Sequence, residues 1–186
     1  ETGDEELLAA LHRLWNSATR RRMYVTGGIG STAKNEGFTE DYDLPNESAY
    51  AETCAALALV FFAHRMLQIE ADGTYADVME RCLYNGTISG VGLEGDLFFY
   101  ENPLSSSGDH HRQEWFGCAC CPPNLARLLA SLGGYVYSTA DNGLYVHLYV
   151  GSEVQTDVSG TAVRVRQKTQ YPWDGDVKIT VKMADA

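Results

Sequence analysis

The sequence has few cationic residues and no long apolar stretch, and each absence excludes a class of function. Lysine and arginine number 14 against 25 aspartates and glutamates, which gives a formal net charge of −11 and a pI near 4.8. Such a chain repels the phosphates of nucleic acid and of anionic lipid. No apolar run approaches the roughly 20 residues that a transmembrane helix needs. We therefore expect no nucleic acid and no membrane as partner.

Cysteine is also scarce, and its spacing does not suggest a framework of disulfides. The chain has five cysteines, an odd number. Two of them, Cys120 and Cys121, are adjacent, and adjacent cysteines rarely bond to each other because the peptide between them strains the disulfide. Free thiols are typical of a reducing compartment, so we expect a cytoplasmic protein.

Helical patterns fill the first part of the chain, and strand patterns fill the last part. Apolar spacing predicts helices at 5–19, 55–69, 75–89 and from Pro122 to about Tyr137. Alternating apolar and polar residues predict strands at 97–100, 144–150, 161–166 and 176–182. The fold class that follows is mainly α with β structure at the C-terminal end.

The change of pattern near residues 140–143 predicts a domain boundary there. Helices followed by strands are typical of separate layers or domains, so we expect domains at 1–141 and 142–186. The short strand at 97–100 should pair with residues 89–93. Residues 19–45 show no period and predict a long irregular loop, which in a compact protein is usually functional or disordered.

Four side chains offer the ligands of a metal site: Glu52, Cys54, Cys120 and Cys121. Three thiols and a carboxylate can close a tetrahedral zinc site. Glu52 and Cys54 are two residues apart, so on a regular helix they would point in nearly opposite directions. We therefore expect an extended or kinked backbone there and a helix that begins close to Cys54. On the residues alone, buried cysteines acting as small hydrophobes are an equally open alternative.

Two prolines follow the adjacent cysteines. Proline suits the first turn of a helix, and Pro122 should push Cys121 away from the α region. Cys120 and Cys121 would then lie at a helix N-terminus, where the macrodipole and the unpaired N–H groups favour thiolate.

Other candidate sites are weaker. Cys118 could be a further sulfur ligand or a mere neighbour, and Cys82 fits the apolar face of a helix. The histidine pair at 110–111 suggests a His/Cys zinc knuckle, but adjacent histidines in a polar loop are more often exposed to solvent. A Gly-x-Gly motif at 28–30 fits a loose dinucleotide fingerprint. The residues that follow it cannot form the long helix which that site requires.

Five segments carry a resemblance to a known family. They are Tyr24-Val-Thr-Gly-Gly-Ile-Gly-Ser31, Tyr42-Asp-Leu-Pro-Asn46, Tyr50-Ala-Glu-Thr-Cys54, Phe98-Phe-Tyr-Glu-Asn-Pro103 and Phe116-Gly-Cys-Ala-Cys-Cys-Pro-Pro123. Together they resemble glycoside hydrolase family 127, the zinc-dependent β-L-arabinofuranosidases with a cysteine nucleophile. The Ala-Glu-Thr-Cys and Cys-Ala-Cys-Cys-Pro-Pro elements make the resemblance highly specific.

The resemblance implies a role for each candidate residue. The four ligand residues named above would hold Zn²⁺, and Cys120 would also be the nucleophile. Glu36 would be the general acid/base, and Tyr100 would lie beside the sugar. The implied reaction is retaining hydrolysis that releases terminal β-L-arabinofuranose from an oligosaccharide or glycoconjugate.

The resemblance also implies an architecture: part of an (α/α)6 toroid followed by the first strands of a β-sandwich. Family members are several times longer, and the chain begins with Glu1 rather than Met, so we expect a fragment. A partial toroid would expose apolar faces, which predicts association, for example into a homo-oligomer. The alternatives are a non-catalytic zinc-stabilised module, an inactive fragment of such an enzyme and, less favoured, a thiol redox protein.

Overall fold

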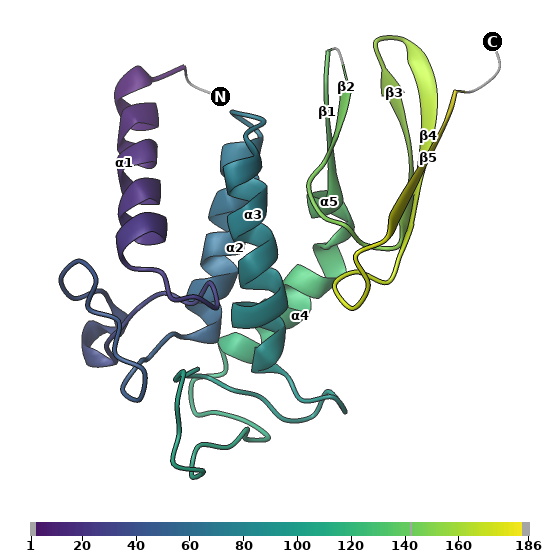
Figure 1. Ribbon diagram of the computed structural model, residues 1–186. Coiled ribbons are helices and arrows are strands. Elements are labelled where there is room, and N and C mark those ends of the chain that lie inside the picture. Colours follow the sequence, from purple (N-terminus) through teal and green to yellow (C-terminus); the bar gives the residue numbers. More distant parts are fainter. Residues whose placement is uncertain (1–2, 142, 184–186) are drawn as a thin grey trace.

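The computed structural model describes residues 3–141 and 143–183, and helices precede strands along it (Figure 1). The α-helices are α1 (Glu5–Arg21), α2 (Thr53–Leu67), α3 (Gly73–Arg81), α4 (Cys121–Ser131) and α5 (Gly133–Val136). Shorter helical segments are η1 (Lys34–Glu36), η2 (Cys82–Thr87) and η3 (Ile88–Gly90). The strands are β1 (Tyr137–Ala140), β2 (Gly143–Val146), β3 (Ser152–Val158), β4 (Thr161–Thr169) and β5 (Val177–Met183). The predicted fold class is confirmed.

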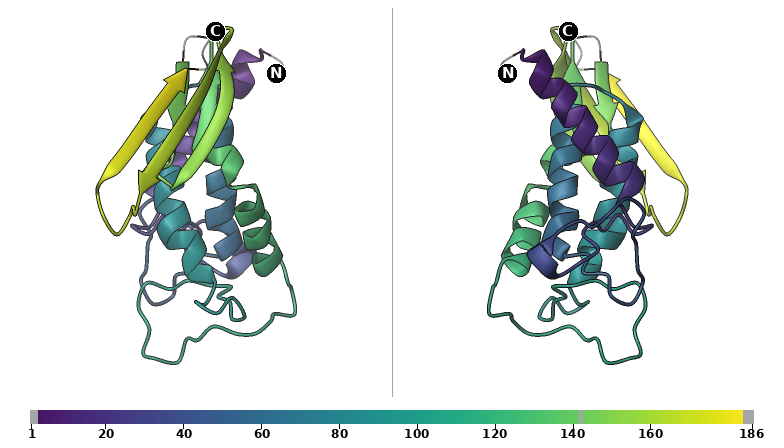
Figure 2. Two further views of the ribbon diagram at one scale, coloured as in Figure 1. Left: turned by 90° about the vertical axis from the view of Figure 1, so that its right-hand side faces the viewer. Right: turned by 90° about the vertical axis from the view of Figure 1, so that its left-hand side faces the viewer.

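The helices α2 and α3 lie side by side at the centre of the molecule. Figures 1 and 2 show α1 on one side of this pair and the strands on the other. On α2, Leu57, Leu59 and Val60 are at most 2% exposed, so this helix is the core of the helical part. Within 3–141 and 143–183, no helix has both the length and the apolarity needed to cross a membrane.

The first helix forms where its capping residues predict it. The carboxylate of Asp4 accepts a hydrogen bond from the backbone N–H of Leu7 at 3.0 Å, which caps the N-terminus. Arginines in the last turn complement the negative end of the helix dipole. The buried residue of α1 is Trp15, whose ring packs edge-on against Phe62 and Tyr75 at 5.3 and 4.9 Å. This aromatic cluster attaches α1 to the central helices.

The predicted helix at 75–89 corresponds to three consecutive helical segments of different type. After α3 the chain continues as a π-helical turn, η2, and then as the 3₁₀ turn η3. Gly27, with φ of +81°, allows a close approach here, since a Cβ on it would lie 2.8 Å from Cys82 Cα. Cys82 is fully buried, and its thiol donates to the Gly27 carbonyl at 3.2 Å. Cys82 therefore belongs to the core, as expected.

Two long loops, residues 22–52 and 91–120, lie at the end of the molecule where α2 and α4 begin (Figure 1). The predicted strand at 97–100 is present only as isolated bridges, in which Phe98 pairs with Val91 and with Gln113. Its expected pairing with 89–93 is therefore correct, but no regular strand forms. Both loops reach the first turns of these two helices.

The helix after the two prolines starts earlier than expected. Cys121 is already helical and Cys120 has α-region angles, whereas Pro122 was expected to push Cys121 out of that region. The backbone N–H of Asn124 donates to the Cys120 carbonyl at 3.1 Å and closes the first turn. Cys121 is 1% exposed, and packing of this kind can outweigh a local steric preference. The predicted single helix to about Tyr137 is divided at Leu132 into α4 and α5.

The C-terminal strands form two antiparallel sheets. β1 pairs with β2, and β4 pairs with both β3 and β5. The predicted strands at 161–166 and 176–182 correspond to β4 and β5, while β2 ends at Val146, four residues before the predicted 144–150 strand does. β1 and β3 were not predicted. Residue 142, the expected first residue of the second domain, lies outside the described residues, and the boundary stays a prediction.

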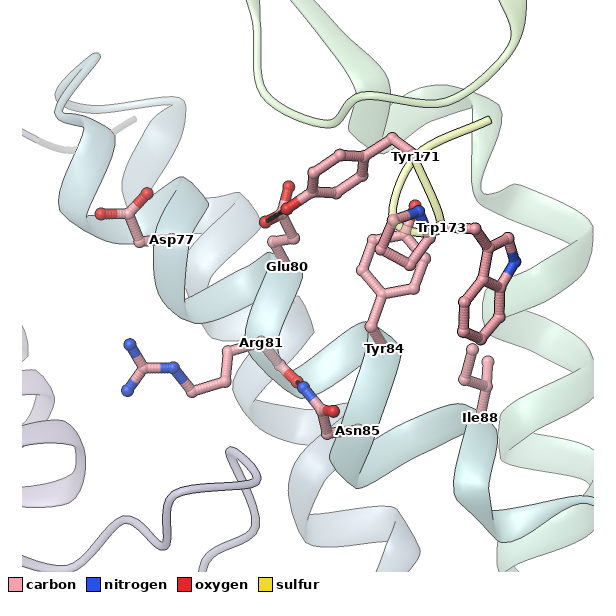
Figure 3. A pocket seen from close by; sticks show the side chains of 9 residues that line it. Asp77, Glu80, Arg81, Tyr84, Asn85, Ile88, Tyr171 and Trp173 are labelled. Carbon is pink, nitrogen blue, oxygen red and sulfur yellow. Dashed lines mark hydrogen bonds between the residues drawn. The ribbon is translucent and has the colours of Figure 1, made fainter. Parts of the chain in front are cut away.

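The loop between β4 and β5 connects the sheet to the central helices. Tyr171 in this loop donates a hydrogen bond to the Glu80 carboxylate at 2.6 Å, and its ring meets Tyr84 edge-on at 5.9 Å. Figure 3 shows the Tyr171 side chain next to Glu80 and Tyr84, and Trp173 beside Ile88. These residues line a cleft of about 640 Å³. This junction fixes the sheet against α3 and η2.

Candidate metal and catalytic site

Two helix N-termini bring the four predicted ligand residues together. Glu52 immediately precedes α2, and Cys54 lies in its first turn, while Cys120 immediately precedes α4 and Cys121 begins it. One ligand atom from each residue lies within 4.8 Å of the others. We call these four residues the Cys/Glu cluster. The Glu52 and Cys121 side chains are buried, and those of Cys54 and Cys120 are half-buried.

The backbone around Glu52 explains how residues two apart can face one centre. Ala51 has φ of +40°, and Glu52 is extended with ψ of 138°, before α2 begins at Thr53. The N–H of Thr53 donates to the Tyr100 carbonyl at 2.9 Å and fixes this start. The prediction of a non-helical backbone here, with the helix starting close to Cys54, is confirmed.

Hydrogen bonds among the ligand atoms centre on the Glu52 carboxylate. The thiols of Cys120 and Cys121 both donate to its Oε1 atom at 3.4 Å, and their sulfur atoms are 3.7 Å apart. Each of the five cysteines of the chain is a free thiol. The cluster is therefore a set of unpaired sulfur donors around one carboxylate.

The protein groups shift the thiol pKa values in opposite directions. A hydrogen bond from Cys121 lowers the pKa of Cys54 to about 7. Burial raises the pKa of Cys120 to about 11, and the hydrogen bond to Cys54 raises the pKa of Cys121. Without a metal, burial and the shared protons thus oppose ionisation of Cys120 and Cys121, whereas the position at a helix N-terminus is expected to favour it.

The donor set fits a soft or borderline divalent cation. Three thiols and one carboxylate match the ligand types and the number of a closed tetrahedral zinc site. A cation among them would reverse the raised pKa values, because a coordinated thiol is deprotonated. The residues present thus have the chemistry that a metal centre needs.

The other sulfur and imidazole candidates lie outside this cluster. Cys118 is exposed, and among the described residues it belongs to no group of potential ligands. His110 stacks on Phe99 with ring centroids 4.9 Å apart, and its Nε2 lies 3.0 Å from the Glu101 carbonyl. His110 therefore has a packing role in the loop at 91–120, and His111 is exposed.

Two tyrosines, Tyr50 and Tyr100, connect Glu36 to the Cys/Glu cluster. The Tyr50 hydroxyl donates to Glu36 Oε1 at 2.9 Å, and the Tyr50 and Tyr100 rings are 6.2 Å apart. The Tyr100 hydroxyl lies 3.1 Å from the Cys120 sulfur, within hydrogen-bond distance. A continuous row of side chains thus runs from the Glu36 carboxylate to the Cys120 sulfur.

Tyr50 is a residue of this site that was not predicted. It stands two positions before Glu52 in the Tyr-Ala-Glu-Thr-Cys motif, so the motif itself held the signal. Its partner Glu36 has φ of +48° at the end of η1, and only the return of the 22–52 loop brings the two side chains together.

Comparison with known proteins shows the family of the chain. The sequence profile of the β-L-arabinofuranosidase GH127 catalytic domain matches residues 1–134, and that of the GH127 middle domain matches residues 143–186. A non-reducing end β-L-arabinofuranosidase of Bifidobacterium longum subsp. longum is 43% identical over 194 residues, which cover 97% of this chain and 29% of that protein.

Solved structures agree with the sequence comparison. A GH127 β-L-arabinofuranosidase from Geobacillus stearothermophilus T6 is 56% identical with a TM-score of 0.94, over 98% of this chain and 30% of that one. The GH127 β-arabinofuranosidase BT3674 is 44% identical with a TM-score of 0.92, over 97% of this chain and 28% of that one. The likeness fits part of an (α/α)6 toroid followed by strands of a β-sandwich.

The chain spans about 30% of the length of these relatives. Within that span, the catalytic-domain profile matches the helical part and the middle-domain profile matches the C-terminal part with the strands. The chain therefore belongs to glycoside hydrolase family 127 and carries parts of its catalytic and middle domains.

Proposed function

We propose that this chain carries the nucleophile, the acid/base and the metal ligands of a retaining glycoside hydrolase that releases terminal β-L-arabinofuranose. The observation that carries the proposal is the row of side chains from Glu36 through Tyr50 and Tyr100 to Cys120, which ends in the Cys/Glu cluster. A carboxyl group and a sulfur nucleophile are the two groups that double displacement at a glycoside needs.

The proposed metal is Zn²⁺, held by Glu52, Cys54, Cys120 and Cys121. When bound, zinc would lower the thiol pKa values so that the Cys120 sulfur is a thiolate near neutral pH. The carboxylate and the three thiolates together would leave the site anionic, which preserves the nucleophilicity of the sulfur.

The proposed reaction has two steps, each using residues of this chain. In the first, the Cys120 sulfur bonds to the anomeric carbon while the C–O bond to the leaving group breaks, and Glu36 gives its proton to the departing oxygen. In the second, Glu36 takes a proton from water, the water oxygen bonds to the anomeric carbon, and the C–S bond breaks. Tyr50 holds the Glu36 carboxylate in place through its hydroxyl.

The proposed substrate is an oligosaccharide or glycoconjugate with a terminal β-L-arabinofuranosyl residue. The names of the relatives from Bifidobacterium longum and Geobacillus stearothermophilus support this class, since both are called β-L-arabinofuranosidases. The alternative is a zinc-stabilised module, or a fragment without activity of its own. This alternative needs a test because the chain spans only 29% of the Bifidobacterium relative.

Two measurements test the proposal. Elemental analysis of the purified chain after mild dialysis should find about one zinc per molecule. Full-length protein trapped during turnover should carry a mass increment of one pentose on a peptide that contains Cys120. Zinc without any adduct would favour the non-catalytic module, whereas an adduct on Cys118 would show that the wrong sulfur was chosen.

A further inference from the structure

The side chain of Asn102 joins the two segments that carry the candidate site residues. Its Nδ2 atom donates to the Ala51 carbonyl at 2.9 Å and to Thr53 Oγ1 at 3.0 Å. Its backbone N–H donates to the Tyr50 carbonyl at 3.0 Å. Ala51 and Thr53 flank Glu52 in the chain, so one amide group contacts both neighbours of a proposed metal ligand, the first through its backbone carbonyl and the second through its side chain.

The surroundings of Asn102 require an NH₂ group at this position. The carbonyl oxygens of Ala51 and Tyr100, 2.9 and 3.5 Å from Nδ2, can only accept hydrogen bonds. The Thr53 hydroxyl gives its own proton to the Phe99 carbonyl at 2.9 Å, so it also acts as an acceptor toward Asn102. An aspartate of the same shape would present a carboxylate to these oxygens and donate nothing.

The backbone at Ala51 depends on such support. Its φ of +40° lies in the left-handed region, which residues with a Cβ adopt only where the surrounding structure holds them. Ala51 is 2% exposed, and its N–H donates to the Gly30 carbonyl at 2.7 Å. This conformation changes the chain direction just before Glu52 and allows Glu52 and Cys54 to face one centre.

We propose that Asn102 is the positioning residue of the site. It holds the turn at Ala51, and through that turn it directs Glu52 and Cys54 into the Cys/Glu cluster. The same contacts keep the Tyr100 segment against the start of α2, where the Tyr100 hydroxyl reaches Cys120. The inference rests on the proposed function, and Asn102 acts through its neighbours rather than on the substrate.

The test compares Asn102→Asp with Asn85→Asp in the otherwise unchanged chain. Asn85 is a matched control, because its Nδ2 also donates to a backbone carbonyl, that of Arg81 at 3.0 Å, but on an exposed helical turn. Zn²⁺ affinity is measured by competition with a chelator, and ligand geometry by the absorption spectrum of bound Co²⁺. Asn102→Asp should bind Zn²⁺ about 10–100-fold more weakly, as loss of an outer-shell partner does, and should alter the Co²⁺ spectrum. The control should keep both.

A metal-independent measurement separates this inference from the proposed function. Dibromobimane, which bridges two neighbouring thiols, should cross-link Cys54 to Cys120 or Cys121 in the unmodified chain treated with chelator. The cross-link yield should fall several-fold in Asn102→Asp and remain in the control. An unmodified chain that cross-links but binds no Zn²⁺ would refute the zinc proposal, and its cross-link yields would still decide the role of Asn102.

If Asn102→Asp fails to fold, Thr53→Val provides the same test, because it removes one partner of the amide and keeps the side-chain shape. It should shift zinc affinity and cross-link yield in the same direction by less. The positioning role would be overturned if the folded variants kept the zinc affinity, the Co²⁺ spectrum and the cross-link yield of the unmodified chain.

Discussion

At the scale of single residues, Cys120 and Cys121 show how two neighbours in the chain acquire different chemistry. Cys121 is 1% exposed in the first turn of α4, whereas Cys120 is half-buried and bonds to the Tyr100 hydroxyl. A nucleophile must be within reach of the substrate, whereas a metal ligand need not be. The difference in exposure therefore supports Cys120 as the attacking sulfur and Cys121 as a ligand only.

The sulfur ligands can be told from the neighbouring thiol by a matched pair of variants. Cys121→Ser should weaken Zn²⁺ binding by at least the roughly 10–100-fold that loss of an outer-shell partner costs, because a neutral hydroxyl replaces a thiolate. Cys118→Ser, at an exposed position outside the cluster, should keep about one zinc. Elemental analysis after dialysis measures both, and equal zinc loss would place Cys118 among the ligands.

The proposed role of Glu36 predicts a dependence on the leaving group. In the full-length enzyme, Glu36→Ala should slow hydrolysis of glycosides with poor leaving groups by about 10²–10⁴-fold. Activated aryl glycosides should lose less, because their leaving oxygen needs little protonation. Glu40→Ala, at another exposed position of the same loop, is the control and should retain activity. Equal losses on both substrate types would indicate that Glu36 only positions the sugar.

At the scale of elements, the loop between β4 and β5 decides how the sheet is attached to the helices. Tyr171 combines a hydrogen bond to Glu80 with edge-on contacts to Tyr84 and Tyr149, each with ring centroids 5.9 Å apart. The hydrogen bond to Glu80 raises the pKa of Tyr171 to about 12 from 10.0. The protonated hydroxyl is thus part of the junction.

Tyr171→Phe should weaken this junction without removing its aromatic contacts. Loss of one hydrogen bond typically costs about 1 kcal/mol of unfolding free energy, measurable by urea denaturation near pH 7. Tyr145→Phe, in β2, is the control and should change stability little. The raised pKa sets the sign with pH: the hydroxyl's contribution is complete below pH 10 and is lost as pH rises toward about 12. The unmodified chain and Tyr171→Phe should therefore converge in stability at alkaline pH. A difference that stays constant with pH would show that the hydrogen bond contributes nothing.

At the scale of the whole molecule, the chain contains the proposed reacting groups but about 30% of the length of its relatives. Large apolar side chains are exposed on it, among them Leu14 at 61%, Val25 at 78% and Trp173 at 92%. Exposed apolar surface of this kind is typical of faces that other segments or partners cover.

We predict that the isolated chain has little or no glycosidase activity, even with zinc bound. Alignment of the sugar with the attacking group contributes several kcal/mol of barrier lowering, and we expect segments outside this chain to supply part of it. The chain and the full-length enzyme are compared on an aryl β-L-arabinofuranoside at equal zinc occupancy. Matching specific activities would show that residues 1–186 already form a complete pocket.

Much of the helical part could be predicted from the sequence, because the period of apolar residues reports burial directly. The predicted helix at 5–19 appears as Glu5–Arg21, and that at 55–69 as Thr53–Leu67. The sequence signal was weaker where packing acts against local preference. Cys82 in the π turn bonds to Gly27, and the helical Cys121 before Pro122 bonds to Glu52. No local pattern records such contacts with distant segments.

The ligand types of the site and the need for a non-helical backbone at Glu52 could be predicted, because both follow from side-chain chemistry and from the spacing of two residues. That two helix N-termini meet, that Tyr50 reaches Glu36 and that Asn102 bonds to Ala51 at φ of +40° became visible only in the folded molecule. These contacts join residues 14 to 69 positions apart. Their geometry depends on how loops 22–52 and 91–120 fold back on the helices, and the packing of the whole molecule sets that.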